Sequence, residues 1–235
     1  MVDSSSLSSN PRILAVVPAR GGSKGVPRKN IRLLNGKPLI IYTLDTASTI
    51  DTIDTLVVST DDDKIAKIVE DYGVKVIQRP SELALDTSTT EVVLLHALEV
   101  LKEEGKEYDV VLVLEPTSPL RSDKTIEKAI SMVVNGVAES VLSVRKTWEN
   151  IGYYESGFFR PVLQNAPRRR QLRDPFYIES STIYAVKTSW LMNTGTLVCK
   201  DWGALVVNDI EASDINTEGD FLFVEYLIKK IGNGK

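Results

Sequence analysis

A short apolar run followed at once by a glycine-rich basic segment constrains the fold of this chain most strongly. Residues 13–17 read Ile-Leu-Ala-Val-Val, which is typical of a strand buried on both faces of a parallel sheet. Pro18 ends the run, because proline cannot donate to a strand ladder. Residues 19–30 then hold three glycines and four cations. Glycines let backbone N–H groups converge on an anion, and nearby cations strengthen that attraction. We therefore predict that this loop binds a polyphosphate.

A flexible, basic surface turn is the alternative interpretation of residues 19–30. The phosphate site is favoured, because anion sites in α/β folds commonly follow a buried strand. The loop matches neither of two well-known phosphate motifs. Gly25 precedes Val26 instead of the Lys-Ser/Thr pair of the Walker motif, and Gly21 and Gly22 are adjacent, which breaks the dinucleotide pattern.

The bulk composition is that of one soluble α/β domain with room for a small appendage. A net charge of −4 over 235 residues argues against a general nucleic-acid binder. The cations gather at 20–32 and 168–173, which favours an anionic small molecule. The single cysteine, Cys199, excludes an intramolecular disulfide and favours a reducing cytoplasm. No apolar run is long enough to span a membrane, so no membrane partner is expected. Residues 1–12 are predicted to be a disordered tail.

Strands and helices are predicted to alternate along most of the chain. Strands are expected at 13–17, 55–59, 74–78, 109–114, 139–144, 182–186 and 204–207, and helices at 37–49, 62–72, 88–105, 122–135 and 217–231. Ser88 with Glu91, and Thr217 with Asp220, would cap two of the helices. The alternation predicts a doubly wound, mostly parallel sheet. Ligands bind such sheets beyond the carboxyl ends of the strands, so loops 19–30, 60–62 and 115–121 should share one cleft.

Residues 147–178 interrupt this pattern with aromatics, prolines and arginines. Residues 152–159 look like a β-hairpin that turns at Ser156-Gly157. The excursion is too small to hold a core of its own. We therefore expect this excursion to pack against a second copy of the chain in a homodimer. Residues 13–146 and 179–235 are expected to form the α/β domain.

The acidic segment 209–218 precedes the last predicted helix. Asp214 and Asn216 stand two residues apart, so on an extended backbone they would face the same side. If they reach the phosphate loop, their oxygens could hold Mg²⁺ together with substrate phosphates. An alternative interpretation is equally well supported: these acidic residues would serve only to stabilise the N-terminus of the following helix, whose dipole favours negative charge there.

Several motifs in this order resemble those of the CMP-sialic acid synthetases, also called acylneuraminate cytidylyltransferases. The resemblance spans about 13–230 and rests on these stretches: ARGGSKGVPRKN at 19–30, STD at 59–61, RPSELALDTSTT at 79–90, LEPTSPLR at 114–121, RRRQL at 168–172, IY at 183–184 and SDINTE at 213–218. It implies a Rossmann-like fold, a Mg²⁺ cofactor and dimerisation through an excursion like 147–178. The implied reaction transfers CMP from CTP to the anomeric hydroxyl of a nonulosonic acid and releases pyrophosphate.

The resemblance also implies roles for individual residues. The loop at the CTP phosphates would comprise Ala19, Arg20, Gly21, Gly22, Ser23 and Lys24. Lys24, with Arg20, would stabilise charge on the leaving pyrophosphate. Positions around cytosine and ribose would be held by Asn30, Arg79 and Thr90. Arg169 or Arg170, with Tyr184 beside it, would bind the carboxylate of the sugar acid. Asp214 would hold metal and act as the base, with Asn216 as the second metal ligand.

Three departures from the family pattern affect the metal and the acceptor sugar. Asn216 stands where the family usually has a second aspartate, which should lower metal affinity or rate unless Asp209 or Glu218 substitutes. Glu115 stands where glutamine is common, so the acceptor would sit differently or carry an amino group. Residues 179–182 replace an Asn-Gly-Ala stretch. Two alternatives therefore stay open: CMP transfer to an eight-carbon keto sugar acid or a non-sugar acid, and a non-catalytic nucleotide-binding homologue.

Overall fold

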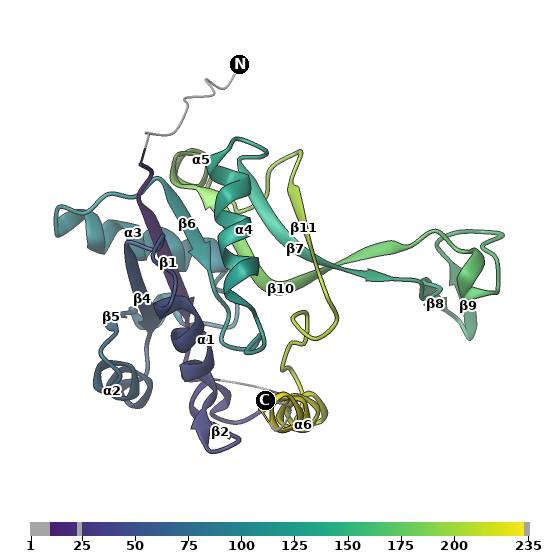
Figure 1. Cartoon of the computed structure of the whole chain (residues 1–235), viewed down its shortest axis with the longest axis horizontal. Coiled ribbons are helices and arrows are strands. Elements are labelled where there is room, and N and C mark those ends of the chain that lie inside the picture. The colour runs from purple at the N-terminus through teal and green to yellow at the C-terminus, as the bar shows by residue number, and fades with distance from the viewer. Residues whose placement is uncertain (1–9, 23–24, 233–235) are drawn as a thin grey trace.

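The computed structural model describes residues 10–22 and 25–232. Among them a sheet of seven strands has the order β11-β7-β10-β6-β1-β4-β5 (Figure 1). Its strands are β1 Ile13–Pro18, β4 Thr55–Thr60, β5 Lys75–Gln78, β6 Val110–Val113, β7 Ser140–Thr147, β10 Phe176–Lys187 and β11 Gly203–Val207. The helices are α1 Leu39–Ser48, α2 Asp63–Asp71, α3 Thr90–Glu103, α4 Asp123–Val134, α5 Thr188–Thr194 and α6 Glu218–Gly232. Most of residues 1–12, and Ser23 and Lys24, lie outside the described residues.

The apolar run at 13–17 packs on both of its faces, as the sequence predicts. Ile13, Ala15 and Val17 join the core beneath α1, α2 and α4. Leu14 and Val16 join the opposite core beneath α3 and α5. Alternate residues of one strand therefore serve two layers, and the doubly wound arrangement is confirmed (Figure 1). Strand β6 lies at the centre of the sheet.

Strand β10 is the antiparallel member of an otherwise parallel sheet. It runs antiparallel to both β6 and β7, while the other ladders are parallel. The predicted strand at 182–186 is too short, because β10 begins at Phe176 and passes through a register shift between Ser180 and Tyr184. The Ser143 hydroxyl holds this bulge by donating to the Ser180 carbonyl at 2.7 Å and accepting from the Ile183 N–H. Polar residues in the bulge hide the strand from a search for apolar runs.

An arm projects from the sheet at the outer ends of β7 and β10 (Figure 1). Its hairpin pairs β8 Gly152–Glu155 with β9 Phe158–Pro161. Ser156 and Gly157 have φ of 49° and 89°, which suits the predicted tight turn. The predicted division between 178 and 179 falls inside β10, so arm and domain share one continuous strand.

The helix caps are partly as predicted. Thr217 and Asp220 exchange hydrogen bonds at the start of α6, as predicted. Ser122, which was not predicted as a cap, caps α4 by accepting from the Thr125 N–H. The prediction of a capping box at Ser88 is wrong. The α3 N-cap is Thr89, because Ser88 is held in a preceding turn and its hydroxyl donates to the Glu82 carbonyl. Within the described part of the chain, no helix is long and apolar enough to cross a membrane.

Candidate active site

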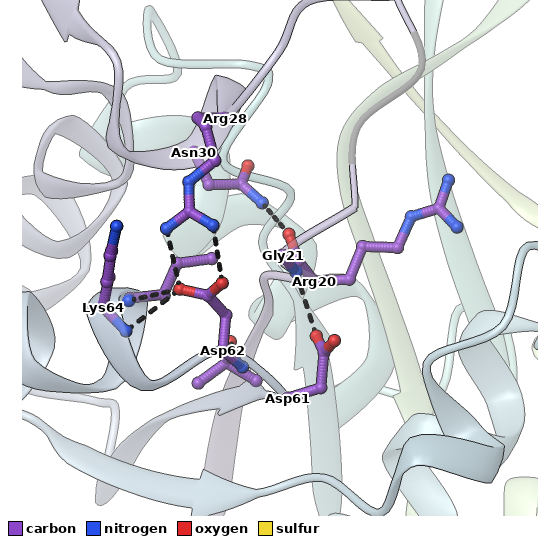
Figure 2. A network of polar contacts seen from close by, with 9 residues as sticks. Arg20, Gly21, Arg28, Asn30, Asp61, Asp62 and Lys64 are labelled. Atoms are coloured by element: carbon purple, nitrogen blue, oxygen red, sulfur yellow. Dashed lines mark hydrogen bonds and ion pairs between the residues drawn. The ribbon is translucent and has the colours of Figure 1, made fainter.

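The glycine-rich loop leaves β1 at the carboxyl edge of the sheet and is tied to the end of β4 (Figure 2). Ala19 is fully buried and its N–H donates to the Ser59 carbonyl at 2.9 Å. The Gly21 N–H donates to Asp61 Oδ1 at 2.9 Å. The Asn30 amide, predicted near the base, donates to the Arg20 carbonyl at 3.0 Å. These bonds fix the path of the loop, while Gly22 stays exposed.

An ion pair supports the underside of the loop. Arg28 donates two hydrogen bonds to Asp62, at 2.8 and 3.1 Å, and Asp62 also caps α2. Burial opposes ionisation of Asp62, yet bonds from the Ile65 N–H and Arg28 leave its pKa below the ordinary value. A side chain at Gly21 would place its Cβ 2.6 Å from Asp62 Oδ2. Glycine is therefore required where the loop crosses this pair.

A cavity of about 230 Å³ opens beside the loop. It brings together residues from the ends of β1, β5 and β6 and the start of α3, among them Arg20, Arg79, Asp86, Thr89, Thr90 and Glu115. Four of these were predicted as site residues: Arg20, Arg79, Thr90 and Glu115. Figure 2 shows the Arg20 side chain pointing away from Asp61 and Asp62. Its Nη1 contacts Asp86 Oδ1 at 2.5 Å. Loops 19–30 and 115–121 therefore share a cavity as predicted, whereas residues 60–62 are not part of its lining.

Arg79 is a buried cation in the wall of this cavity. Its Nη2 donates to the Ser59 carbonyl at 2.8 Å and its Nε to the Ser59 hydroxyl at 3.2 Å. Burial lowers the pKa of Arg79, and the charges of Asp61 and Glu115 oppose that effect. These bonds fix the guanidinium plane at the edge of β4.

Glu115 is a partly buried carboxyl group among cations. Burial raises its pKa to about 7; Arg121, Lys29 and Arg79 act to lower it, while Asp214 adds to the rise. A carboxyl group with such a pKa changes charge near neutral pH, so this wall of the cavity is sensitive to pH.

Arg121 organises the loop after β6, and sequence reasoning gave it no role. Its guanidinium donates to the Glu115 carbonyl at 2.9 Å and to the Thr182 carbonyl in the β10 bulge. Burial lowers the pKa of Arg121 to about 10, against the opposing charges of Glu115, Asp214 and Glu211. The motif LEPTSPLR was quoted for its resemblance, but nothing in its spacing reveals that its last residue joins two distant loops.

The acidic segment folds across the phosphate loop. Val26 and Ile215 are both fully buried in one apolar cluster with Phe221 of α6. Lys29 Nζ donates to the Ile215 carbonyl at 2.5 Å. A Cβ on Gly25 would lie 2.0 Å from the Asn216 carbonyl oxygen, so the two backbones touch. The hypothesis that loop and acidic segment meet is confirmed for the described residues.

Lys29 is a second residue that sequence reasoning counted without assigning a role. Burial lowers its pKa, and the negative charges of Asp214 and Glu115 oppose that effect. Its ammonium group is therefore close enough to both carboxylates to be influenced by their charges. Arg20 is also close enough to influence it.

Asp214 and Asn216 face each other, as their spacing predicts. Asn216 Nδ2 donates to Asp214 Oδ2 at 2.6 Å. The other oxygen, Asp214 Oδ1, is buried and has no hydrogen-bond partner among the residues that the structure describes. Such an oxygen suits a hard cation whose remaining ligands are phosphate and water. Nowhere in residues 10–22 and 25–232 do three or more His, Cys, Asp or Glu side chains form a metal cluster.

A second cavity, of about 420 Å³, lies between the base of the arm and the acidic segment. Its basic wall carries Arg145, Lys146 and Arg170 together with Glu149, and its acidic wall carries Asp209, Asp214 and Asp220. Trp148 supports two of the cations, because Arg170 and Lys146 lie 4.9 and 5.0 Å from its ring centre. Arg170 and Asp214 therefore share one hollow with opposite charges across it.

Two predicted acceptor residues lie elsewhere. Arg169 is exposed and precedes the 3₁₀ turn Arg170–Leu172. The Tyr184 hydroxyl donates to Glu179 Oε1 at 2.8 Å. Burial, and then Glu179, raise the pKa of Tyr184, and Glu115 adds to the rise. Tyr184 thus contacts a carboxylate of its own strand, and its pairing with the arginines stays a prediction.

Comparison with known proteins gives consistent matches. Residues 14–187 match the family described as cytidylyltransferase. CMP-N,N'-diacetyllegionaminic acid synthase of Legionella pneumophila is 34% identical over 93% of this chain and 97% of its own length. Pseudaminic acid cytidylyltransferase of Campylobacter jejuni is 38% identical over 49% of this chain and 50% of its own. The structure of CMP:2-keto-3-deoxy-manno-octonic acid synthetase complexed with CTP superposes with a TM-score of 0.71 at 18% identity, over 93% of this chain and 99% of that one. That last likeness concerns the fold alone.

Proposed function

The chain belongs to the cytidylyltransferase family, and from that premise we propose that it transfers CMP from CTP to the anomeric hydroxyl of a sialic-acid-like nonulosonic acid. Pyrophosphate is the second product. The observation that carries the proposal is the contact between phosphate loop and acidic segment, where Lys29 Nζ meets the Ile215 carbonyl at 2.5 Å. That contact sets cations for a triphosphate beside a carboxylate for an acceptor. The near-full-length relative named for a CMP-linked legionaminic acid supports the choice of acceptor.

CTP occupies the 230 Å³ cavity in this proposal. Arg20 and Lys29 offset the charge that builds on the leaving pyrophosphate, and Lys24, outside the described residues, is proposed for the same task. Fixed cations in a partly buried site stabilise such charge without having to reorganise. Arg79, held in place by Ser59, faces the nucleotide together with Thr90.

The sugar acid occupies the 420 Å³ cavity. Its carboxylate is repelled by the acidic wall and pairs with Arg170 on the basic wall, which orients the molecule. A guanidinium suits this task, because it can donate two parallel hydrogen bonds to a carboxylate. The opposite end of the sugar, with its anomeric hydroxyl, then faces Asp214. The chain contributes mainly position and charge.

Asp214 accepts the proton of the acceptor hydroxyl through its unpartnered Oδ1. Asn216 fixes the carboxylate by donating to Oδ2, which leaves Oδ1 for the proton. Mg²⁺, when bound, would neutralise phosphate charge; Asp214 would hold it, with the Asn216 carbonyl group as a neutral second ligand. One carboxylate with substrate phosphates is a usual magnesium site, so the residues present fit the ion.

A homodimer in the cytoplasm completes the proposal. Tyr153, Tyr154, Phe158 and Phe159 on the arm are 72, 83, 61 and 56% exposed. Such a group of aromatics marks a contact surface, and a second copy of the chain is its proposed occupant. The cytoplasm would supply the CTP.

The proposal is tested by pyrophosphate release. The full chain is incubated with Mg²⁺, with CTP or UTP, and with nine-carbon and eight-carbon keto sugar acids. Release is expected with CTP and at least one nine-carbon acid. Asp214→Asn should abolish it, while Asp209→Asn, in the same acidic wall, should keep it. A folded chain that binds CTP yet releases pyrophosphate with none of the acids would contradict the proposal.

A further inference from the structure

One carboxylate of the nucleotide cavity already contacts a cation of the phosphate loop. Arg20 Nη1 donates to Asp86 Oδ1 at 2.5 Å, and both side chains line the 230 Å³ cavity. A carboxylate oxygen makes the same charge-assisted hydrogen bond to a guanidinium as a phosphate oxygen does. A phosphate that reaches Arg20 therefore competes with Asp86 and is repelled by its charge.

The pair between Arg28 and Asp62 shows what a permanent contact looks like in this loop. Asp62 accepts from Arg28 twice and from the N–H groups of Lys64 and Ile65, and its side chain is 16% exposed. Withdrawing Asp62 would uncap α2. That pair is part of the scaffold.

Asp86 differs from Asp62 in its exposure and its backbone setting. Its side chain is 48% exposed, and it lies on residues 80–89, whose regular structure is a single 3₁₀ turn, Ser81–Leu83. Backbone bonds in this segment join near neighbours, as from the Leu83 N–H to the Pro80 carbonyl. Asp86 can therefore leave Arg20 without unwinding a helix.

We infer that Asp86 is an exchangeable substitute for phosphate on Arg20 and selects ligands that carry a polyphosphate. The name of the nucleotide rests on the proposed function, but the exchange does not. A triphosphate carries several negative charges and displaces a single carboxylate. A single phosphate group, such as that left in a CMP-linked product, carries about the same charge as Asp86 and therefore displaces Asp86 from Arg20 poorly. Asp86 therefore returns to Arg20 once pyrophosphate has left, which favours product release.

The test is calorimetric binding of CTP, inorganic tripolyphosphate and cytidine to the full chain. Asp86→Asn should tighten both polyphosphates about 2- to 5-fold, the range expected from removing an exposed ion pair. Cytidine binding should not change. Glu82→Gln is the matched control, because it removes one exposed charge from the same segment. On an Arg20→Ala background, Asp86→Asn should bring a smaller gain than on the wild-type background.

Three results would overturn the inference: weaker or unchanged tripolyphosphate binding by a folded Asp86→Asn chain, an equal gain with Glu82→Gln, or an equal gain for cytidine. Asp86→Ser provides a second neutral variant if Asp86→Asn fails to fold. Tripolyphosphate separates this inference from the proposed function. A chain that gives the predicted tripolyphosphate pattern but does not bind CTP upholds the exchange and contradicts cytidylyl transfer.

Discussion

Replacing Gly25 by alanine is expected to impair catalysis while leaving most of the fold intact. The added Cβ would lie 2.0 Å from the Asn216 carbonyl oxygen, whereas real Cβ contacts stay beyond 3.0 Å. Loop and acidic segment must therefore separate by about 1 Å. A misplacement of about 1 Å can cost about 10²-fold in rate. Overpacking of this kind costs about 1–3 kcal/mol of stability, which a domain of this size tolerates.

The assay compares kcat/KM for pyrophosphate release with thermal unfolding of the same preparations. Gly219→Ala is the matched control, because its Cβ would meet only the Thr217 hydroxyl, at 3.5 Å. It adds the same methyl group near the same acidic segment and should keep full activity. A Gly25→Ala chain with unchanged kcat/KM and unchanged melting temperature would refute the contact between loop and segment on which the site depends.

Four further predictions follow from the charged and apolar groups around the site. Lys29→Met should lower kcat by about 10²-fold with little change in melting temperature, measured by pyrophosphate release and circular dichroism. Arg121→Met should lower the free energy of unfolding by about 3–5 kcal/mol in urea titrations, because it leaves the carbonyl groups of Glu115 and Thr182 without their donor and removes the positive charge that acts on the Glu115 carboxylate. The pKa of Glu115 is raised from 4.5 to about 7, so the wild-type chain loses stability as the pH rises between these values. In urea titrations, Glu115→Gln should therefore be more stable than the wild type by about 3 kcal/mol at pH 8 and about equally stable at pH 4. The double variant Tyr154→Ser, Phe158→Ser should sediment as a monomer at concentrations where wild type is a dimer, and an unchanged sedimentation coefficient would contradict the proposed interface.

Local sequence predicted the regular part of the fold well. The run at 13–17 could only be a buried strand, because its five apolar residues leave no polar face. Thr217 and Asp220 stand where side-chain oxygens cap a helix, and both do so. These features depend on neighbours within a few residues, which is the range over which sequence patterns are informative.

The features that the sequence did not predict depend on contacts between residues far apart in the chain. Arg121 gains its role from a carbonyl 61 residues away, at Thr182, and Lys29 from one 186 residues away, at Ile215. The length of β10 is hidden by Ser180 and Thr182, whose hydroxyls are buried in the bulge. A polar side chain gives no local indication of whether its partner is water or a remote backbone group. Sequence alone could therefore name the loops of the site but not what holds them together.

The most direct test of cytidylyl transfer follows the fate of the α-phosphorus. The chain is given CTP labelled at the α- or the γ-phosphorus, together with a nine-carbon nonulosonic acid, and the products are separated by chromatography. The account predicts that α-label moves into a CMP-linked sugar acid while γ-label leaves in pyrophosphate. Label that stays in CTP, or that emerges as free CMP with no sugar adduct, from a folded chain would contradict it.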